Sequence, residues 1–388
     1  MHLIPAFGTV LPIVVAAFAA AAVLSLVATP IVIRAARRVG AVDEPNSRRV
    51  NATPVPRGGG VAVAVAYLLV ATVVVVLNEH ADLIPDPNRP ETSTFLAVLA
   101  GGALAAVLGL LDDLLQLRAR WQLLTQLVVA AVPVLAGVTP AILNNPLGPG
   151  TIPLGVAAAA GFTVVWILGM INSINFIDGL DGLSSGIAFI AAVTLGVISL
   201  TTVIGVTGQP LVGVLCFALA GALLGFLRWN FHPAKVFIGT TGVMFVGYML
   251  AILAILGAAK VAVALLVLGV PIIDTFWIIV RRLATGRSPF TPDRGHIHHR
   301  LLDLGLSHAQ TVLVIYLICV VLAVLSVVLS GDEQVYAFLG LAVAFGLGLF
   351  LLARGDEGAL EAEAYESPPD ARRPAARPPR GTSGGPGE

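Results

Sequence analysis

The chain has 388 residues, of which 57% are hydrophobic and only 11% are charged. This composition excludes an ordinary soluble protein, because apolar runs of about 20 residues recur along the chain and are typical of transmembrane helices. The formal net charge is zero, so no bulk attraction to nucleic acid is expected, and the two cysteines, Cys216 and Cys319, are expected to pack in the apolar core.

Eleven apolar runs predict an all-α, polytopic integral membrane protein. They lie at about 9–33, 58–77, 94–111, 121–138, 154–171, 183–204, 210–227, 241–257, 261–280, 310–330 and 335–353. The first run is too long for a signal peptide and lacks its cleavage pattern, so we expect a retained helix. The runs define an expected transmembrane domain over residues 1–354. Residues 355–388 are rich in Pro, Arg, Gly and Glu, which predicts a disordered tail.

The distribution of Lys and Arg predicts an orientation, because these residues accumulate in cytoplasmic loops. With the N-terminus outside, every Lys and Arg except Arg89 and Lys260 falls in an inner loop or in the C-terminal tail. We therefore expect a multi-pass protein of the inner (cell) membrane with a cytoplasmic C-terminus. The outer loops carry little chemistry, and every polar cluster lies on the cytoplasmic side.

The most informative stretch runs from Asn172 to Gly182 and reads N-S-I-N-F-I-D-G-L-D-G. It places two amides, the second of them Asn175, and two carboxylates, Asp178 and Asp181, between two apolar runs. Ionisable groups at a membrane boundary are costly, so they indicate a functional site. The alternative interpretation is a turn, because Asp-Gly is a common turn dipeptide and Asn caps helices.

The first two inner loops carry glycines and paired carboxylates. The first contains D-E-P-N (Asp43–Asn46) and P-V-P-R-G-G-G (Pro54–Gly60). Glycines that open a helix can present backbone N–H groups to an anion or allow helices to pack closely, and both interpretations stay open. The second loop opens with Asp112 and Asp113, whose repulsion a divalent cation or a shared proton would relieve. A solvated helix end is the alternative.

The inner loop Arg228–Gly242 carries Asn230 and Lys235, which could meet a nucleotide. His232 precedes a proline and is equally consistent with a structural role. Asp274, in the inner half of the ninth run, is expected to serve as an internal ion-pair partner rather than as a catalyst.

The fifth inner loop, Gly286–Arg300, is the longest and most polar. It contains three histidines in four positions, His296, His298 and His299, with Arg294 beside them. Such a cluster suits a phosphate site or a proton-transfer site. Zinc is a competing idea, but no cysteine is near and the carboxylates elsewhere suit a harder ion.

These loops bring acids, amides, histidines and arginines to one membrane face. The pattern predicts a site where a phosphorylated soluble molecule meets a molecule held in the bilayer. Carboxylates with a divalent metal would neutralise the charge of a diphosphate, and arginines or backbone N–H groups would hold the rest.

At these residues, over roughly positions 10–330, the chain resembles the polyprenyl-phosphate N-acetylhexosamine-1-phosphate transferases. That family includes the bacterial enzymes that start O-antigen, teichoic-acid and arabinogalactan-type polymers, and the related phospho-MurNAc-pentapeptide translocase. The resemblance implies ten or eleven transmembrane helices, Mg2+ (or Mn2+), a UDP-aminosugar donor and a polyprenyl phosphate acceptor. The implied products are UMP and a lipid-diphosphate sugar, and a homodimer is left open.

The resemblance also implies roles for the acidic motifs. Asp112 and Asp113 match the family's Asp-Asp pair, which is linked to acceptor activation and to the metal. Asn175, Asp178 and Asp181 match its N-x-x-D-G-x-D-G motif, which lies by the nucleotide and the metal. We therefore expect Asp112, Asp113 and Asp178 to be catalytic and to hold the metal, and Asn175 and Asp181 to bind substrate.

The remaining matches imply further substrate-binding residues. Asn230 matches the asparagine of the family's F-N-x-x-P-A segment, and His296, His298 and His299 match its histidine motif, with Arg294 beside them. H-I-H-H preceded by R-S-P-F-x-x-D looks like the GlcNAc-phosphate branch, whereas the pentapeptide branch has three consecutive histidines.

The chain departs from the family pattern at two places. The family usually has G-D-x-G-S after the F-N-x-x-P-A segment, with the aspartate as a metal ligand, but here Thr240 stands at that position. The first loop shows Arg49 and Asn51 where the family usually has Lys and His. Both departures concern metal and phosphate geometry.

The sequence therefore predicts a phosphoglycosyl transferase that moves GlcNAc-1-phosphate, or a close relative, onto undecaprenyl phosphate and starts a cell-envelope polysaccharide. A transporter or flippase is one alternative, and it predicts acids near the bilayer midplane on several helices. A catalytically impaired homologue that acts as a scaffold is the other, and Thr240 is the hint for it.

Overall fold

The structure is a computed structural model that describes residues 2–3, 7–43, 54–86, 90–145, 150–202, 209–257, 260–284, 296–329, 333–344 and 346–347. The predicted tail and Arg294 lie outside the described residues. The chain divides into two compact units, Met1–Ala342 and Val343–Glu388. The helix bundle and the strands belong to the first unit.

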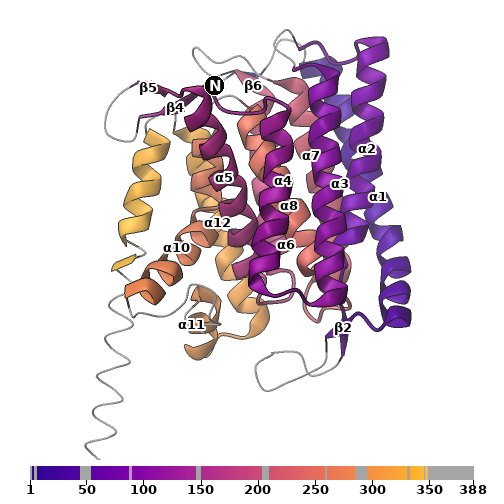
Figure 1. The fold of residues 1–388 in the computed structure, drawn as a ribbon, viewed down its shortest axis with the longest axis vertical. Helices are drawn as coiled ribbons and strands as arrows, with labels where there is room; N and C mark the ends of the chain where they lie inside the picture. The colour runs from indigo at the N-terminus through magenta and orange to yellow at the C-terminus, as the bar shows by residue number, and fades with distance from the viewer. Residues whose placement is uncertain are drawn as a thin grey trace, which may run out of the picture. The chain divides into compact units, whose positions relative to one another are not determined.

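Helices dominate the first unit and run side by side along most of its length (Figure 1). They are α1 (Phe7–Val39), α2 (Gly60–Ala81), α3 (Thr92–Leu115), α4 (Ala119–Leu135), α5 (Val156–Ile177), α6 (Leu183–Ser199), α7 (Pro210–Asn230), α8 (Gly239–Leu256), α9 (Lys260–Val267), α10 (Gly269–Ala284), α11 (Ile297–Asp303) and α12 (His308–Val328). Ten of the eleven apolar runs therefore correspond to these helices, with edges that differ by several residues.

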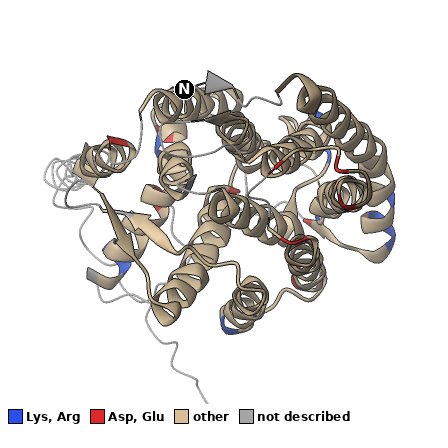
Figure 2. Ribbon diagram, turned by 90° about the horizontal axis from the view of Figure 1, so that it is seen from above, with Lys and Arg blue, Asp and Glu red and all other residues tan. Residues whose placement is uncertain are grey.

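Seven of the described helices are long and apolar enough to cross a membrane, namely α1, α2, α3, α5, α7, α8 and α12. Three apolar helices are shorter, namely α4, α6 and Glu333–Ala344. Most of the ribbon in Figure 2 is neither acidic nor basic. The prediction of a mostly helical, multi-pass membrane protein is confirmed, whereas the predicted count of eleven spans is not.

The ninth apolar run is not one straight helix. It is divided into α9 and α10, and the two halves are bent by 78°. Pro271 explains the break, because its ring clashes with the carbonyl group four residues earlier, at Val267, where α9 ends. The bend gives α10 a direction of its own, and α10 carries the buried Asp274.

Three short antiparallel ribbons complete the otherwise helical fold. They pair β1 (His2–Leu3) with β6 (Thr201–Thr202), β2 (Val42–Asp43) with β3 (Val55–Pro56), and β4 (Ile142–Asn144) with β5 (Thr151–Pro153). The β2–β3 ribbon matters for function, because its register places Asp43 opposite Val55. It thereby brings Asp43, the first residue of one polar motif of the first inner loop, next to the second motif.

The core of the bundle is formed by α7 and α8, whose spans are each 83% buried. α7 packs between α1 and α6, and α8 packs between α3 and α5. A Cβ atom on Gly221 or Gly225 would collide with the backbone of α1 at Phe18 or Ala22. Small residues therefore let the α7 and α1 backbones touch, as is usual between helices in membranes. The predicted core packing of the two cysteines is confirmed, since both are buried.

Candidate active site

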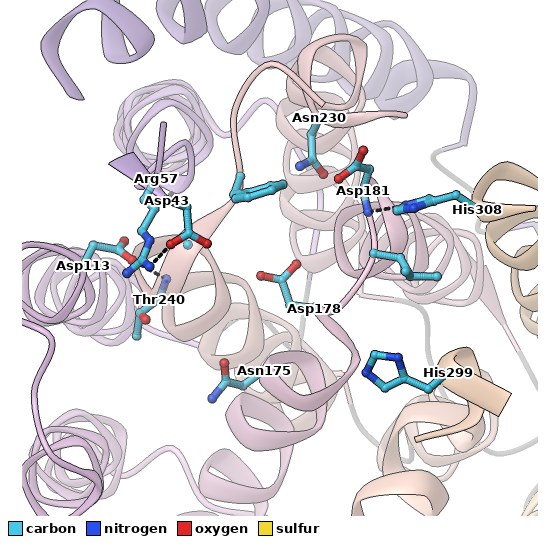
Figure 3. Close-up of a pocket in the computed structure, with 14 residues that line it drawn as sticks. Asp43, Arg57, Asp113, Asn175, Asp178, Asp181, Asn230, Thr240, His299 and His308 are labelled. Carbon is cyan, nitrogen blue, oxygen red and sulfur yellow. Dashed lines mark hydrogen bonds and ion pairs between the residues drawn. The ribbon is translucent and has the colours of Figure 1, made fainter. Parts of the chain in front are cut away.

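A polar cavity of about 350 Å³ opens where the ends of several helices meet (Figure 3). Its walls come from the β2–β3 ribbon, the end of α3, the α5–α6 turn, the α7–α8 connection, and the beginnings of α8, α11 and α12. It is lined by Asp43, Arg57, Asp113, Asn175, Asp178, Gly179, Leu180, Asp181, Asn230, Phe237, Gly239, Thr240, His299 and His308. The inner loops that the sequence singled out therefore converge on one cavity.

Asp178 occupies the middle of the cavity in Figure 3. It follows directly after α5 and accepts a hydrogen bond of 2.6 Å from the Ser184 hydroxyl. Desolvation raises the pKa of Asp178 to about 7, the Ser184 hydrogen bond opposes the rise, and the Asp113 and Asp181 carboxylates add to it. A cation in the cavity would offset the desolvation of the Asp178 carboxylate and its repulsion by the neighbouring acids, so Asp178 is the best-placed carboxylate to bind one.

Asp113 is held at the beginning of α8. Its carboxylate accepts the backbone N–H of Thr240 at 2.9 Å, the backbone N–H of Thr241 at 2.9 Å and the Thr241 hydroxyl at 2.6 Å. An anion at a helix N-terminus is stabilised by the unpaired N–H groups there. Gly239 permits the approach, because its φ is +70° and a Cβ there would lie 2.6 Å from Asp113 Oδ2. Asp113 thus caps α8 and fixes Thr240 in the cavity wall.

Asp113→Asn is expected to lower both stability and activity. Asparagine keeps one carbonyl oxygen and has an NH2 group, which cannot accept a hydrogen bond, in place of the other. One of the two backbone N–H groups therefore loses its acceptor, at a cost of about 1–3 kcal/mol. Thermal unfolding of the purified protein in detergent should show a lower Tm than the wild type. Asp303→Asn, at an exposed site on α11, is the control. An unchanged Tm for Asp113→Asn would contradict the capping role.

Asp112 does not line the cavity, although it is adjacent to Asp113. Its carboxylate accepts the Leu117 backbone N–H at 3.0 Å and the Gln122 amide at 3.1 Å. Successive residues on a helix point in different directions, so the two acids are separated. Asp112 stabilises the α3–α4 turn, and its catalytic and metal-binding roles stay predictions.

Asp181 anchors the α7–α8 connection to the α5–α6 turn. Its Oδ2 accepts the Ala234 backbone N–H at 3.0 Å and lies 2.7 Å from His232 Nδ1. Its own backbone N–H donates to His308 Nε2 at 2.8 Å, and the rings of His232 and His308 stack with centroids 4.3 Å apart. His308 was missed from the sequence, because a histidine that begins an apolar helix resembles an ordinary helix end.

The three predicted histidines have different surroundings. His296 Nδ1 lies 2.7 Å from Asp274 Oδ2, which is the contact that the predicted ion-pair role of Asp274 requires when His296 is protonated. His298 is buried against Gly179, and His299 alone of the three lines the cavity. Burial and the neighbouring histidines lower the pKa of His298 to about 2, so it stays neutral. The motif therefore offers one cavity-facing imidazole and two that support it.

Gly179→Ala is expected to disturb the cavity without any change of charge. An added Cβ would collide with the ring of His298 and must displace α11 or the turn that holds Asp178. We expect at least about a tenfold loss of activity, because small displacements of reacting groups cost that much or more. Gly169→Ala, where an added Cβ meets no atom within 4 Å, is the control. Equal activity of both variants with wild type would refute the contact.

The asparagines divide between structure and cavity. Asn230 lines the cavity, donates to the Val236 carbonyl at 3.0 Å and accepts a hydrogen bond from the Ser185 hydroxyl. Asn175 lies one turn before Asp178, is exposed and also lines the cavity. Asn172 instead donates to Gln126 and is not a lining residue.

The first inner loop contributes an ion pair and close packing. Arg57 pairs with Asp43, and both face the cavity. The N–H groups of Gly59 and Gly60 donate to the carbonyls of Phe237 and Ile238 instead of an anion. A Cβ on Gly60 would collide with α8, so the structure favours the packing interpretation for these two glycines.

The donor set of the cavity fits a hard divalent cation. Asp113, Asp178, Asp181 and Asn175 offer oxygen atoms, and Mg2+ takes one or two carboxylates together with waters and phosphate oxygens. Thr240 adds a hydroxyl. Among the described residues, the ligand atoms of Asp181, His232 and His308 lie within 4.8 Å of one another and could also hold a metal ion, whereas the predicted histidine motif belongs to no such group.

Fold and site together define a multi-pass membrane protein with a polar cavity built from helix ends. Residues 95–258 match the model of glycosyl transferase family 4. The chain is 37% identical over 344 residues to a Bacillus subtilis protein named "Probable undecaprenyl-phosphate N-acetylglucosaminyl 1-phosphate transferase". The aligned region covers 87% of this chain and 90% of that protein.

Two further relatives carry similar names. The decaprenyl-phosphate N-acetylglucosaminephosphotransferase of Mycolicibacterium smegmatis is 35% identical, over 88% of this chain and 89% of that protein. The undecaprenyl-phosphate alpha-N-acetylglucosaminyl 1-phosphate transferase of Yersinia pestis is 28% identical, over 82% of this chain and 84% of that protein. The chain belongs to glycosyl transferase family 4 and to the glycosyl-1-phosphate transferases within it.

Proposed function

We propose that the protein transfers N-acetylglucosamine-1-phosphate, or a close aminosugar phosphate, from a UDP-sugar to undecaprenyl or decaprenyl phosphate. UMP is released, and the lipid-linked product starts a cell-envelope polysaccharide. The observation that carries the proposal is Asp178, a carboxylate with a raised pKa, in a cavity with Arg57 and His299 at the ends of membrane-spanning helices. The names of the relatives support the same reaction.

The cavity is proposed to open on the cytoplasmic side of the inner membrane. α1 ends with Arg37 and Arg38 in its last turn, and the β2–β3 ribbon that follows α1 supplies cavity residues. Basic residues are enriched in the cytoplasmic loops of membrane proteins. A cavity that opens on this side would be accessible to a UDP-sugar in the cytoplasm. A polyprenyl phosphate in the same leaflet would present its phosphate at this level.

The reaction is a phosphoryl transfer between two charged molecules. A phosphate oxygen of the acceptor attacks the β-phosphorus of the donor, a new P–O–P bond forms, and the bond to the bridging oxygen of UMP breaks. Positioning and charge neutralisation supply most of the catalysis in such reactions. Arg57 and His299 are placed to hold phosphate oxygens, and Asn175 to hold a hydroxyl or an amide of the donor. Asp178, with Asp113 or Asp181, would hold Mg2+, which supplies the neutralisation of diphosphate charge.

A second candidate function is that of a catalytically impaired member that acts as a scaffold. The observation that favours it is Thr240, which lines the cavity at the position of the usual family aspartate. The transporter alternative is disfavoured, because the acids of the cavity lie at helix ends rather than along a path through the bundle.

The test is UMP release by the purified full-length protein, reconstituted with undecaprenyl phosphate and Mg2+. UDP-GlcNAc, UDP-GalNAc and UDP-glucose are supplied in parallel. We expect release with an N-acetylated sugar and little with UDP-glucose. Absence of release with every UDP-sugar would refute the enzyme and favour the scaffold.

A further inference from the structure

A second groove, of about 430 Å³, lies outside the candidate active site. Its walls come from the C-terminal part of α1, from β3, and from the end of α7 with the connection that follows. Three of its lining residues are cations, Arg34, Arg37 and Lys235, and no acidic residue lines it in the described part of the chain. The groove therefore has a concentrated positive charge and suits an anion.

The groove has the features of a membrane interface. Trp229 lines it, and its indole N–H donates to the Leu26 carbonyl on α1 at 3.1 Å. The Lys235 ammonium lies 5.2 Å from the centre of the Trp229 ring, within cation–π range. Tryptophan rings of this kind sit at the level of lipid headgroups. Arg34 Nε donates to the Pro30 carbonyl at 3.2 Å, which orients its guanidinium group at the groove.

An apolar stripe continues from the groove along α1. Val23, Leu26 and Val27 lie one and two turns before Pro30 and Arg34, on the same side of the helix, and they are 58%, 38% and 61% exposed. Only 28% of the α1 span is buried, so this stripe is accessible to lipid chains. A molecule with an anionic head and apolar chains would match the groove and the stripe together.

We propose that the groove binds the phosphate headgroup of an anionic phospholipid, with the acyl chains along α1. Basic residues near a membrane surface attract anionic lipid, and the clustering of three of them in a concave site with a tryptophan makes the attraction local. The groove is connected to the candidate active site through the backbone, because Lys235 of the groove follows Ala234, whose N–H donates to the Asp181 carboxylate in the cavity. The bound lipid would thereby steady the α7–α8 connection.

The test is native mass spectrometry of the full-length protein in detergent, with phosphatidylglycerol or phosphatidylcholine added. The wild type should retain phosphatidylglycerol in preference to phosphatidylcholine. Arg34→Gln with Arg37→Gln, and separately Lys235→Gln, should weaken retention, by about fivefold for each charge removed. The control is Arg118→Gln with Arg120→Gln, which removes two exposed cations near Trp121 at the α3–α4 turn.

Competition distinguishes the sources of the phosphate group. Millimolar inorganic phosphate should leave the phosphatidylglycerol adduct intact, and polyprenyl phosphate should bind equally to the wild type and to the groove variants. Equal retention by the wild type and both groove variants would overturn the proposal. Displacement by inorganic phosphate, or loss of polyprenyl phosphate binding in the variants, would also overturn it. These results are independent of transferase activity, so failure of the proposed function does not affect them.

Discussion

Asp178→Asn is expected to reduce UMP release by roughly 10²- to 10³-fold, because one centre of charge stabilisation is removed from the transition state. The side chain keeps nearly the same size, and the Ser184 hydroxyl can still donate to its remaining oxygen. Loss of the negative charge should therefore impair the reaction and leave the fold intact. The measurement is the initial rate of UMP release with saturating UDP-GlcNAc.

Two comparisons separate chemistry from folding in this experiment. Asp303→Asn makes the same chemical change at an exposed position outside the cavity, and it should keep wild-type turnover. The Tm of Asp178→Asn in detergent should equal or exceed that of the wild type, because a carboxylate with a raised pKa destabilises the folded state when it is charged. Turnover of Asp178→Asn within threefold of wild type would remove Asp178 from the reaction.

Thr240→Asp is expected to tighten Mg2+ binding in the absence of nucleotide. Thr240 is the second residue of α8 and lines the cavity, so a carboxylate there gains from the helix N-terminus and adds an oxygen ligand. Outer-shell changes alone alter metal affinity by about 10- to 100-fold, so we expect at least about tenfold from a direct ligand. Asp113 is bonded to the Thr240 N–H, and repulsion between the two acids limits the gain.

Binding and activity should be measured separately for this variant. Mn2+ titration followed by electron paramagnetic resonance reports affinity without substrate, and UMP release against Mg2+ concentration reports the working enzyme. The Thr240→Asn side chain has the shape of the Thr240→Asp side chain without its charge, so the metal affinity of Thr240→Asn should resemble that of the wild type. An affinity of Thr240→Asp equal to that of Thr240→Asn would show that the metal does not reach this position.

The sequence predicted most of the helices, because apolar runs that end in Gly, Pro, Asn and Asp determine where a membrane helix begins and ends. It did not predict the bend between α9 and α10. Pro271 has apolar residues on both sides. A proline inside such a run is often tolerated in a membrane helix, because neighbouring groups satisfy the backbone groups that it leaves unpaired. The apolar helices α4 and α6 have 17 residues each, short of the about 20 that usually cross a bilayer, so apolar content alone predicted more spans than the described helices provide.

The candidate site was predicted better in its motifs than in its individual residues. Helix periodicity turns Asp112 away from Asp113, but a pattern of adjacent letters does not reveal which of them faces the cavity. Arg57 and Asp43 pair only because the β2–β3 ribbon folds the loop back on itself. His308 lies 127 residues from the backbone N–H that it accepts, so no local pattern could connect the two.

The most direct test of the central claim follows the β-phosphorus of the donor. The purified protein is incubated with Mg2+, undecaprenyl phosphate and UDP-GlcNAc labelled with 32P at the β-position. Transfer of the phosphosugar predicts that the label enters the lipid fraction in an amount equal to the UMP released, and that Asp178→Asn reduces both by roughly 10²- to 10³-fold. Release of labelled UDP with unlabelled lipid, or no label in the lipid from the wild type while Thr240→Asp gains it, would contradict the account.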